Sequence, residues 1–248
     1  MIVLKNKTEL DAMRTACQIS AGALKAGGEA VQPGVTTKEI DRIIHRFITA
    51  AGAKPSFLGY GGFPASACIS INNEVIHGIP SDRLIHEGDI VSIDVGACIG
   101  GFHGDNAATF AAGSISQTAQ RLLDTTRESL YEGIRAALAG ARIGDIGYAV
   151  QTYCEARGFS VVRRYVGHGV GRDLHEAPDV PNYGKPGRGV RLVPGMTLAI
   201  EPMINEKGAD VKELSDRWTV VTVDGGLSAH FEHTIAVTSD GPVILTTP

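Results

Sequence analysis

The 248-residue chain is 43% hydrophobic and 20% charged, has a net charge of −4 and contains 31 glycines. This length predicts one hydrophobic core or two closely packed halves, and the glycines predict many tight turns. No basic block is interleaved with aromatic residues and no run reaches the roughly 18 apolar residues of a membrane span, so we expect no direct nucleic-acid function and no membrane role.

The cysteines and the first residues predict the compartment. Cys17, Cys68, Cys98 and Cys154 are far apart and form no CxxC pair, which argues against a disulfide framework and a structural zinc site. The first ten residues, MIVLKNKTEL, lack the apolar segment of a secretion signal. We therefore expect reduced thiols, a cytoplasmic location and a monomer.

Hydrophobic spacing predicts four helices. The first opens with a capping box that begins at Thr8, and the second follows a capping box formed by Thr36 and Glu39. Two more helices are expected over residues 117–139 and 145–157, because apolar residues recur there every three or four positions and a glycine follows each segment.

Short alternating or apolar runs between these helices predict strands. They are ACISI from Ala67, IVSIDV from Ile90, NAATF from Asn106, TLAIE from Thr197, WTVVTV from Trp218 and HFEHTIAV from His230. The turn residues at 224–226 predict that the last two runs form a hairpin. Helices and strands together predict an α+β protein.

Two parts of the chain resemble each other. GDIVSID, residues 88–94, matches GMTLAIE, residues 195–201, with glycine first and a carboxylate last. Each segment follows a pair of predicted helices. We therefore expect residues 1–248 to form a single domain with an internal duplication, whose two halves are related by an approximate twofold axis. A chance match is the alternative, because the segments are short.

Four carboxylates lie in apolar strand contexts, namely Asp94, Asp105, Glu201 and Glu232. If the halves face each other, acids at equivalent positions converge near the axis. Buried carboxylates without partners are too unfavourable to persist, so cations are required nearby. No lysine or arginine lies within these strand segments, which leaves metal ions as the source of positive charge.

Two divalent metal ions would neutralise four acids and would activate water as a nucleophile at neutral pH. His168, in the segment VGHGVGRDLHE, offers one nitrogen ligand, and its glycine neighbours allow close backbone approach. Such a ligand set favours manganese, iron, cobalt or zinc. Each residue alone has an ordinary alternative: a buried acid usually caps a turn, and a lone histidine is as often a core residue.

Five motifs carry a resemblance to a known family. They are NNEVIHGIP, SIDVGACIGGFHGDNAATF, VGHGVGRDLHEAPDVPNY, LVPGMTLAIEPM and HFEHTIAV. In their order and approximate spacing, the chain resembles the type I methionine aminopeptidases. The resemblance implies a pita-bread fold, with two pseudo-symmetric halves around an antiparallel sheet and helices on the outer face. It also implies two metal ions bound by Asp94, Asp105, His168, Glu201 and Glu232.

The resemblance further implies the catalytic groups. Glu201 would exchange protons with the attacking water, His175 would stabilise the tetrahedral intermediate, and His77 would contact the substrate amide. Arg172 and Glu176 are expected to support the loop that carries His175. The resemblance gives no catalytic role to the remaining histidines. Two of them, His230 and His233, are expected near Glu232 as supporting groups.

The resemblance also implies a pocket for the methionine side chain. Its residues would be Tyr60, Phe63, Cys68 and Trp218, with Phe57 and Leu174 nearby. Many members of the family have a tyrosine in place of Phe63 and an aromatic residue in place of Leu174. These two departures put the shape of the pocket in doubt.

The activity that the resemblance implies is metal-dependent removal of the amino-terminal methionine from nascent proteins and peptides, with a preference for a small second residue. The partners would be nascent polypeptides with a free amino terminus, met in transient contact with the ribosome. One alternative is a proline-specific aminopeptidase or prolidase of the same fold. The other is a metal-free binding module, against which the five ligand positions argue.

Overall fold

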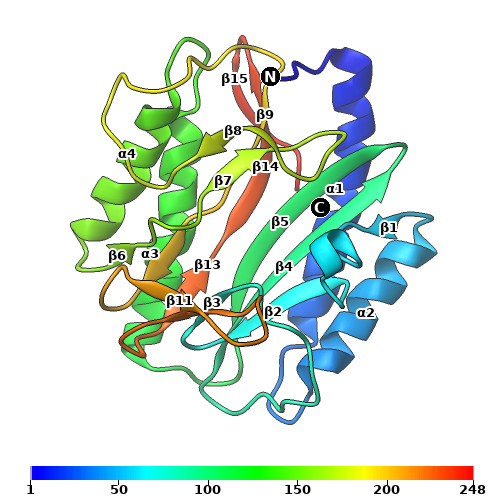
Figure 1. The fold of residues 1–248 in the computed structure, drawn as a ribbon, viewed down its shortest axis with the longest axis vertical. Coiled ribbons are helices and arrows are strands. Elements are labelled where there is room, and N and C mark those ends of the chain that lie inside the picture. The colour runs from blue at the N-terminus through cyan, green and yellow to red at the C-terminus, as the bar shows by residue number, and fades with distance from the viewer. Residues whose placement is uncertain (1, 248) are drawn as a thin grey trace.

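Helices and strands form two layers over residues 2–247, the part of the chain that the computed structural model describes. One layer is a curved sheet, and the other consists of helices that pack on one of its faces (Figure 1). The α-helices described are α1 (Lys7–Glu29), α2 (Thr37–Ala50), α3 (Gln117–Ala136) and α4 (Ile143–Glu155). Among these residues, no helix is long and apolar enough to cross a membrane.

Antiparallel pairs run through a nine-stranded sheet, in the order β1-β4-β5-β14-β9-β7-β8, with β2 beside β4 and β15 beside β14. Its strands are β1 (Lys54–Pro55), β2 (Ala67–Ile71), β4 (Ile90–Ile99), β5 (Phe102–Ala111), β7 (Gly167–Gly169), β8 (Glu176–Val180), β9 (Thr197–Ile200), β14 (Glu232–Thr238) and β15 (Gly241–Ile244).

Two smaller sheets, each of three strands, flank this layer. One contains β13 (Ser228–His230), β10 (Met203–Asn205) and β6 (Ser160–Val161). The other contains β11 (Val211–Glu213), β12 (Val220–Thr222) and β3 (Glu74–Ile76). The expectation of an α+β protein with an antiparallel sheet is confirmed.

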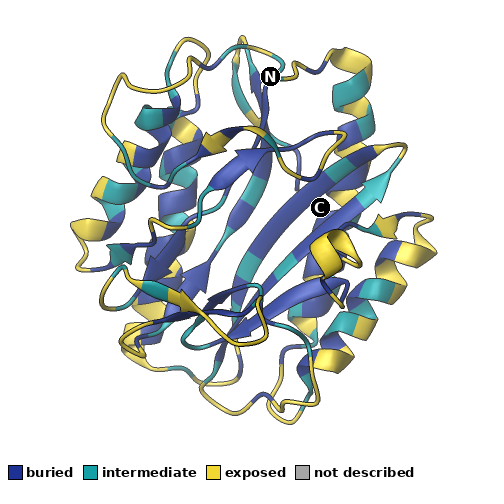
Figure 2. Ribbon diagram, in the orientation of Figure 1, coloured by how far each residue is buried: buried dark blue, intermediate teal, exposed yellow. Residues whose placement is uncertain are grey.

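The core fills the space between the sheet and the helices. Ile44 of α2 packs in one buried cluster with Ile93 and Val95 of β4. Ile146 of α4 packs in a second cluster with Leu198 of β9. Figure 2 shows the central strands buried, with exposed residues on the outer surfaces of the helices and in the loops. Each helix pair thus covers its own part of the sheet.

The start of the first helix differs from the prediction. The capping box is formed by Asn6 and Glu9 rather than by a box beginning at Thr8. The Asn6 side chain accepts a hydrogen bond from the Glu9 amide at 3.0 Å, and the Glu9 carboxylate accepts one from the Asn6 amide at 3.1 Å. The Thr36–Glu39 box of α2 is confirmed.

The bounds of the other helices also shift. α3 ends at Ala136, three residues before the predicted end at residue 139, and Leu138 beyond it is half exposed. α4 begins at Ile143, two residues before the predicted start, because the Asp145 carboxylate accepts a hydrogen bond from the Arg142 amide at 2.7 Å. A side chain in the first turn therefore decides where α4 starts.

The predicted hairpin across residues 224–226 is wrong. β12 pairs with β11 and β3, whereas β14 pairs with β5, β9 and β15. The Asp224 carboxylate accepts hydrogen bonds from the amides of Gly226 and Gly208, which ties this turn to an earlier loop. The turn residues are present, but the chain they redirect enters a separate small sheet as β13.

A glycine sets how closely α1 approaches the sheet. Gly104 of β5 lies beside Asp105, and a Cβ atom at position 104 would lie 2.5 Å from Cys17 Cα and 2.7 Å from the carbonyl carbon of Ala16. Both contacts are with the backbone of α1, which cannot move aside as a side chain can. The absence of a side chain at position 104 therefore lets α1 pack directly on β5.

Replacing Gly104 with alanine should lower the free energy of unfolding by about 1–3 kcal/mol, because α1 must move away from β5. Gly22→Ala is the matched control: its Cβ would meet the ring of Phe47, which is 40% exposed and can rotate, so we expect little loss or a gain. Urea unfolding of both variants measures the difference. Equal stability of the two would refute this role of Gly104.

Candidate active site

A row of aligned side chains crosses the inner face of the sheet, which is the face opposite the helices. Cys68 of β2 is the cross-strand partner of Asp94 of β4. Asp94 and Glu232 of β14 are both partners of Ala107 of β5. Residues directly opposite each other on antiparallel strands point to the same face. The row therefore brings two of the predicted acids to either side of a small alanine.

A neighbouring row holds the other predicted ligands. His168 of β7 and Thr234 of β14 are both partners of Ala199 of β9. Thr234 Oγ1 accepts a hydrogen bond from the Asp105 amide at 3.2 Å and donates one to the Asp105 carbonyl at 2.7 Å. Glu201 lies two residues beyond Ala199, directly after the end of β9. The period of two in each strand thus places all five residues on one face.

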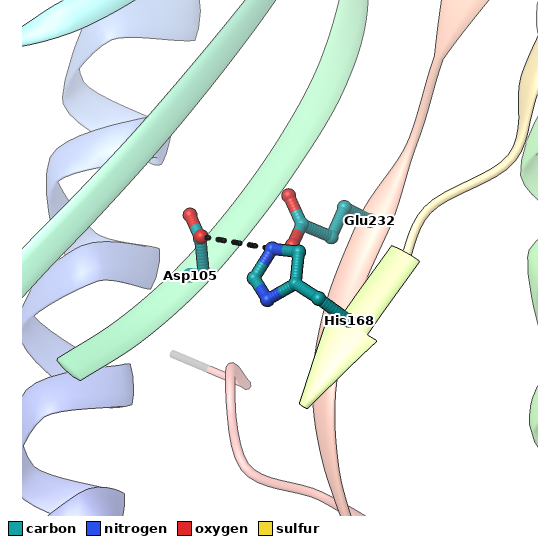
Figure 3. Close-up of side chains that lie close together, drawn as sticks. All are labelled: Asp105, His168 and Glu232. Atoms are coloured by element: carbon teal, nitrogen blue, oxygen red, sulfur yellow. Dashed lines mark ion pairs between the residues drawn. The ribbon is translucent and has the colours of Figure 1, made fainter. Parts of the chain in front are cut away.

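Three of these side chains form a tight cluster. Figure 3 shows Asp105, His168 and Glu232 pointing toward one another, and one ligand atom from each lies within 4.8 Å of the other two. His168 Nε2 is 3.8 Å from Asp105 Oδ2 and 3.6 Å from Glu201 Oε1. Asp105, His168 and Glu232 are all buried.

Burial makes the charged forms of the four acids unfavourable. It raises the pKa of Asp94 to about 7 and that of Glu201 to about 8. It raises the pKa values of Asp105 and Glu232 well above their ordinary range, and repulsion from the neighbouring carboxylates adds to the effect. The protein itself therefore does not supply the positive charge that four ionised acids need.

His168 cannot supply that charge. Burial lowers its pKa to about 3, so the imidazole is neutral at physiological pH. Its Nδ1 atom lies 2.8 Å from the Gly169 carbonyl oxygen. Because a carbonyl only accepts, Nδ1 carries the proton and Nε2 presents a lone pair to the acids. This tautomer is the one that binds a metal ion through Nε2.

Unsatisfied oxygen atoms test whether a metal ion fits. Within residues 2–247, the buried atoms Asp94 Oδ1, Asp105 Oδ1 and Glu232 Oε1 have no hydrogen-bond partner. Such atoms are unfavourable in a protein interior unless a cation or a donor meets them. Four carboxylates and one neutral imidazole nitrogen therefore fit divalent ions such as manganese, iron, cobalt or zinc.

The acids lie at one end of a cavity of about 250 Å³. The cavity contains every side chain that the sequence nominates for metal or substrate binding. Its walls include Asp94, Asp105, His168, Glu201 and Glu232, together with Phe57, Tyr60, Phe63, Cys68, His77, Leu174, His175 and Trp218. The structure brings these residues together, while the role of each one stays a prediction.

The apolar end of the cavity is a small cluster of its own. Phe57, Phe63, Cys68 and Leu174 are buried and pack together, with Trp218 against them. The rings of Phe63 and Trp218 meet edge to face, with their centroids 5.1 Å apart. The two positions that depart from the family, Phe63 and Leu174, are therefore both part of this wall.

His77 lies in the cavity wall with an unusual backbone conformation. Its φ angle is +59°, in the left-handed region that side chains rarely adopt. Its ring centroid is 6.3 Å from that of Trp218 and 5.9 Å from that of Tyr165. Burial lowers the pKa of His77 to about 4, so the ring is neutral. Strained backbone that places a polar group in a cavity is typical of functional sites.

His175 is held by a tyrosine across the cavity mouth. Its Nδ1 atom is 2.7 Å from the Tyr60 hydroxyl, and its ring centroid is 4.2 Å from that of His168. Burial lowers the pKa of His175 as well. The loop of η1 (Tyr60–Gly62), far away in sequence, therefore fixes the direction in which His175 points.

The structure adds residues that sequence reasoning did not nominate. Ile76, Tyr165 and Val166 line the cavity. His230, for which the sequence predicts only a place near Glu232, has its Nε2 atom 3.4 Å from Glu201 Oε2 and is fully buried. Tyr165 lies three residues before His168, which is the one local signal that could have indicated it.

Known proteins are similar to this chain over nearly its whole length. The family model for metallopeptidase family M24 matches residues 11–239. A methionine aminopeptidase of Clostridium perfringens is 55% identical over 246 residues, which cover 99% of each chain.

Solved structures are similar as well. A methionine aminopeptidase from Thermotoga maritima superposes with a TM-score of 0.99 at 44% identity and covers both chains completely. A prolidase from Pyrococcus furiosus has a TM-score of 0.82 at 24% identity, over 99% of this chain and 66% of the prolidase. The second similarity, at this identity, concerns the fold alone.

The raised pKa values predict how the stability of the metal-free protein depends on pH. Below their folded pKa values of about 7 and 8, Asp94 and Glu201 keep protons that the unfolded chain releases near 3.8 and 4.5. The free energy of unfolding therefore falls as pH rises above the unfolded values, and for these two acids the fall ends only once pH exceeds 7 and 8. Between pH 6.5 and 8.5 it should fall by about 2 kcal/mol.

Urea unfolding after exhaustive chelation measures this change, and Asp94→Asn with Glu201→Gln should flatten it. The buried histidines offset only the first part of the fall, because burial keeps them neutral in the folded protein while the unfolded chain releases their protons near pH 6.5. A stability that stays constant or rises from pH 6.5 to 8.5 would contradict the prediction.

Proposed function

The chain belongs to metallopeptidase family M24, and on this basis we propose that it removes the amino-terminal methionine from nascent proteins and peptides, with a preference for a small second residue. The observation that carries the proposal is a cavity lined by four largely buried acids, a neutral imidazole and an aromatic wall. Relatives named methionine aminopeptidase across the whole chain support it. The architecture is the pita-bread fold of this family.

Asp94, Asp105, His168, Glu201 and Glu232 would hold two divalent ions. When bound, such ions supply Lewis acidity that activates water and polarises the scissile carbonyl. The identity of the ions is open among cobalt, manganese, iron and zinc, because all four accept oxygen ligands with one nitrogen. The sequence match that aligns Asp94 with Glu201 also supports a single catalytic domain with duplicated halves.

Glu201 is the proton acceptor of the reaction. Its carboxyl group lies between His168 and His230, at 3.6 Å and 3.4 Å respectively, so its orientation is restrained from both sides. A carboxylate so placed takes a proton from the attacking water and passes it to the leaving amine. Burial that disfavours the charged carboxylate makes it a stronger base than an exposed glutamate.

His175 and His77 act on the substrate rather than on the water. With the Tyr60 hydroxyl donating to Nδ1, the proton of His175 resides on Nε2, from which it can be donated to the developing oxyanion. His77, neutral and held in a left-handed backbone conformation, contacts the substrate amide. Both rings are oriented before substrate arrives, which limits the reorganisation that the reaction requires.

The apolar wall accepts the methionine side chain. A thioether is flexible and gains from sulfur contact with aromatic rings, which Phe63 and Trp218 offer edge to face. Tyr60, Cys68 and Leu174 complete the lining. Where many members of the family have a tyrosine, Phe63 lacks the hydroxyl, and where many have an aromatic residue, Leu174 lacks the ring. The pocket is therefore more apolar and less restricted by ring stacking.

The setting of the reaction follows from its substrate. Nascent chains with a free amino terminus are the partners, and contact with the ribosome is transient. All four cysteines are free, which fits the reducing cytoplasm. The rival function is proline-specific cleavage, because prolidases share the fold at 24% identity. The two functions differ in the peptide that they cleave.

A peptide series with and without metal tests the proposal. The chelated protein should be inactive, and manganese, iron or cobalt should restore release of methionine from Met-Ala-Ser, with slower release from Met-Lys-Ser. Acetylated Met-Ala-Ser should resist cleavage, because the free amine is lost. Rapid cleavage of Ala-Pro-Ser with none of Met-Ala-Ser would transfer the assignment to the proline-specific rival, and no cleavage of any peptide in the presence of these metals would favour a binding module.

Three substitutions separate the roles of Glu201, His175 and His168. Glu201→Gln should lower turnover by roughly 100-fold to 10,000-fold, because it removes the proton acceptor. His175→Ala should slow turnover while the bound metal, measured by elemental analysis, stays near that of the unmodified protein. His168→Ala is the comparison and should lose metal. Equal metal loss from both histidine variants would show that the roles are assigned incorrectly.

A further inference from the structure

A lysine outside the cavity is almost completely buried. Lys5 lies in the segment before α1, and its side chain is 2% exposed, while that of its ion-pair partner Glu176 is 8% exposed. Lysine is almost never buried at this level unless an acid neutralises it. The pair therefore joins two parts of the chain that are far apart in sequence, in a place with little access to water.

Glu176 is the centre of a small network. Besides the Lys5 ammonium, its carboxylate accepts hydrogen bonds from the backbone amide of Arg172 at 2.8 Å and from that of Asp173 at 3.4 Å. These two amides belong to the loop between β7 and β8, and Glu176 is the first residue of β8. The carboxylate thus links the end of the loop to two of its own amides, and Lys5 neutralises the negative charge of that carboxylate.

The segment around Lys5 is anchored independently. The Lys5 amide donates to the Gly195 carbonyl at 2.8 Å, and Nζ also donates to the Val3 carbonyl at 3.2 Å. The loop leaves no free space beside this lysine: a Cβ atom at Gly171 would lie 2.5 Å from Lys5 Cε and 2.7 Å from Nζ. Lys5 is therefore packed against the loop backbone as well as paired with Glu176.

This loop connects His168 and His175, two of the histidines of the candidate site. His168 lies in β7, and His175 directly precedes Glu176, so the carboxylate that Lys5 neutralises follows His175 in the chain. We propose that Lys5 is a positioning residue for methionine removal, which acts through Glu176 to fix the loop that presents His175. The inference rests on the proposed function and adds a residue that does not touch the cavity.

The physical reason is the unfavourable burial of a single charge. Without Lys5, the Glu176 carboxylate would remain buried with two amide donors and no counter-charge. The loop would have to open to hydrate it, and His175 would move with its neighbour. A displacement of about 1 Å at a catalytic group can lower the rate by roughly 100-fold. A neutral side chain at position 176 would remove this driving force and still accept the two amide bonds.

The test uses the full chain with metal bound. Lys5→Met should lower kcat for Met-Ala-Ser by about 10-fold to 100-fold, with KM within about threefold and an unchanged metal content. Lys5→Gln, which keeps a donor without charge, should lie between Lys5→Met and the unmodified protein. The double variant Lys5→Met, Glu176→Gln should recover at least tenfold of the loss, because no buried charge remains.

Hydrogen exchange gives a second readout that does not depend on activity. The amides of Arg172 and Asp173 should exchange at least tenfold faster in Lys5→Met, and those of α2 should not change. Lys38→Met is the matched control: Lys38 pairs with Asp82 on the surface, its side chain is 47% exposed, and both kcat and exchange should stay as in the unmodified protein.

Several outcomes would overturn the proposal. These are an unchanged kcat and unchanged loop exchange in Lys5→Met, a loss of metal from that variant, or a double variant as slow as the single one. If the unmodified protein releases no methionine, the proposed function fails, and the exchange of the two loop amides still decides whether Lys5 fixes the loop.

Discussion

The burial of four carboxyl groups beside one another is the constraint on which the rest of the structure depends. Asp94, Asp105, Glu201 and Glu232 each lie where burial raises their pKa, and they repel one another when ionised. A fold can hold such a group only if the remainder of its core is well packed and a cation compensates the charge. The two helix-covered clusters on the opposite face of the sheet provide that packing.

Side chains alternate along each strand between the helix-facing core and the inner face that carries the site. On β4, Ile93 and Val95 enter the helix-facing core, while Asp94 between them points to the inner face. On β9, Leu198 enters the core and Ala199 faces inward beside His168. A slip of one residue in either strand would exchange the acid and the apolar neighbours, so the core fixes the register that the site requires.

Local sequence determines some features and not others. The capping box at Thr36 and the strand from Ala67 were predictable because each depends on neighbours in the chain. The path of the chain at residues 224–226 was not predictable, because the Asp224 carboxylate accepts a hydrogen bond from the Gly208 amide of an earlier loop. The acids could be found from their apolar surroundings. The sequence placed His230 only near Glu232, and the contacts that bring His230 to Glu201 and Tyr165 to His77 depend on the folded chain.

Ala107, the residue between Asp94 and Glu232, has a consequence for how the site can vary. The two acids are separated by two strand spacings, roughly 10 Å between their backbones, because one strand lies between them. That distance is a whole number of inter-strand spacings, so it cannot change gradually. Only the lengths and rotamers of the acidic side chains can adjust the gap, which lies between an aspartate on one side and a glutamate on the other. The spacing between strands therefore fixes how far apart the backbones of the two acids lie.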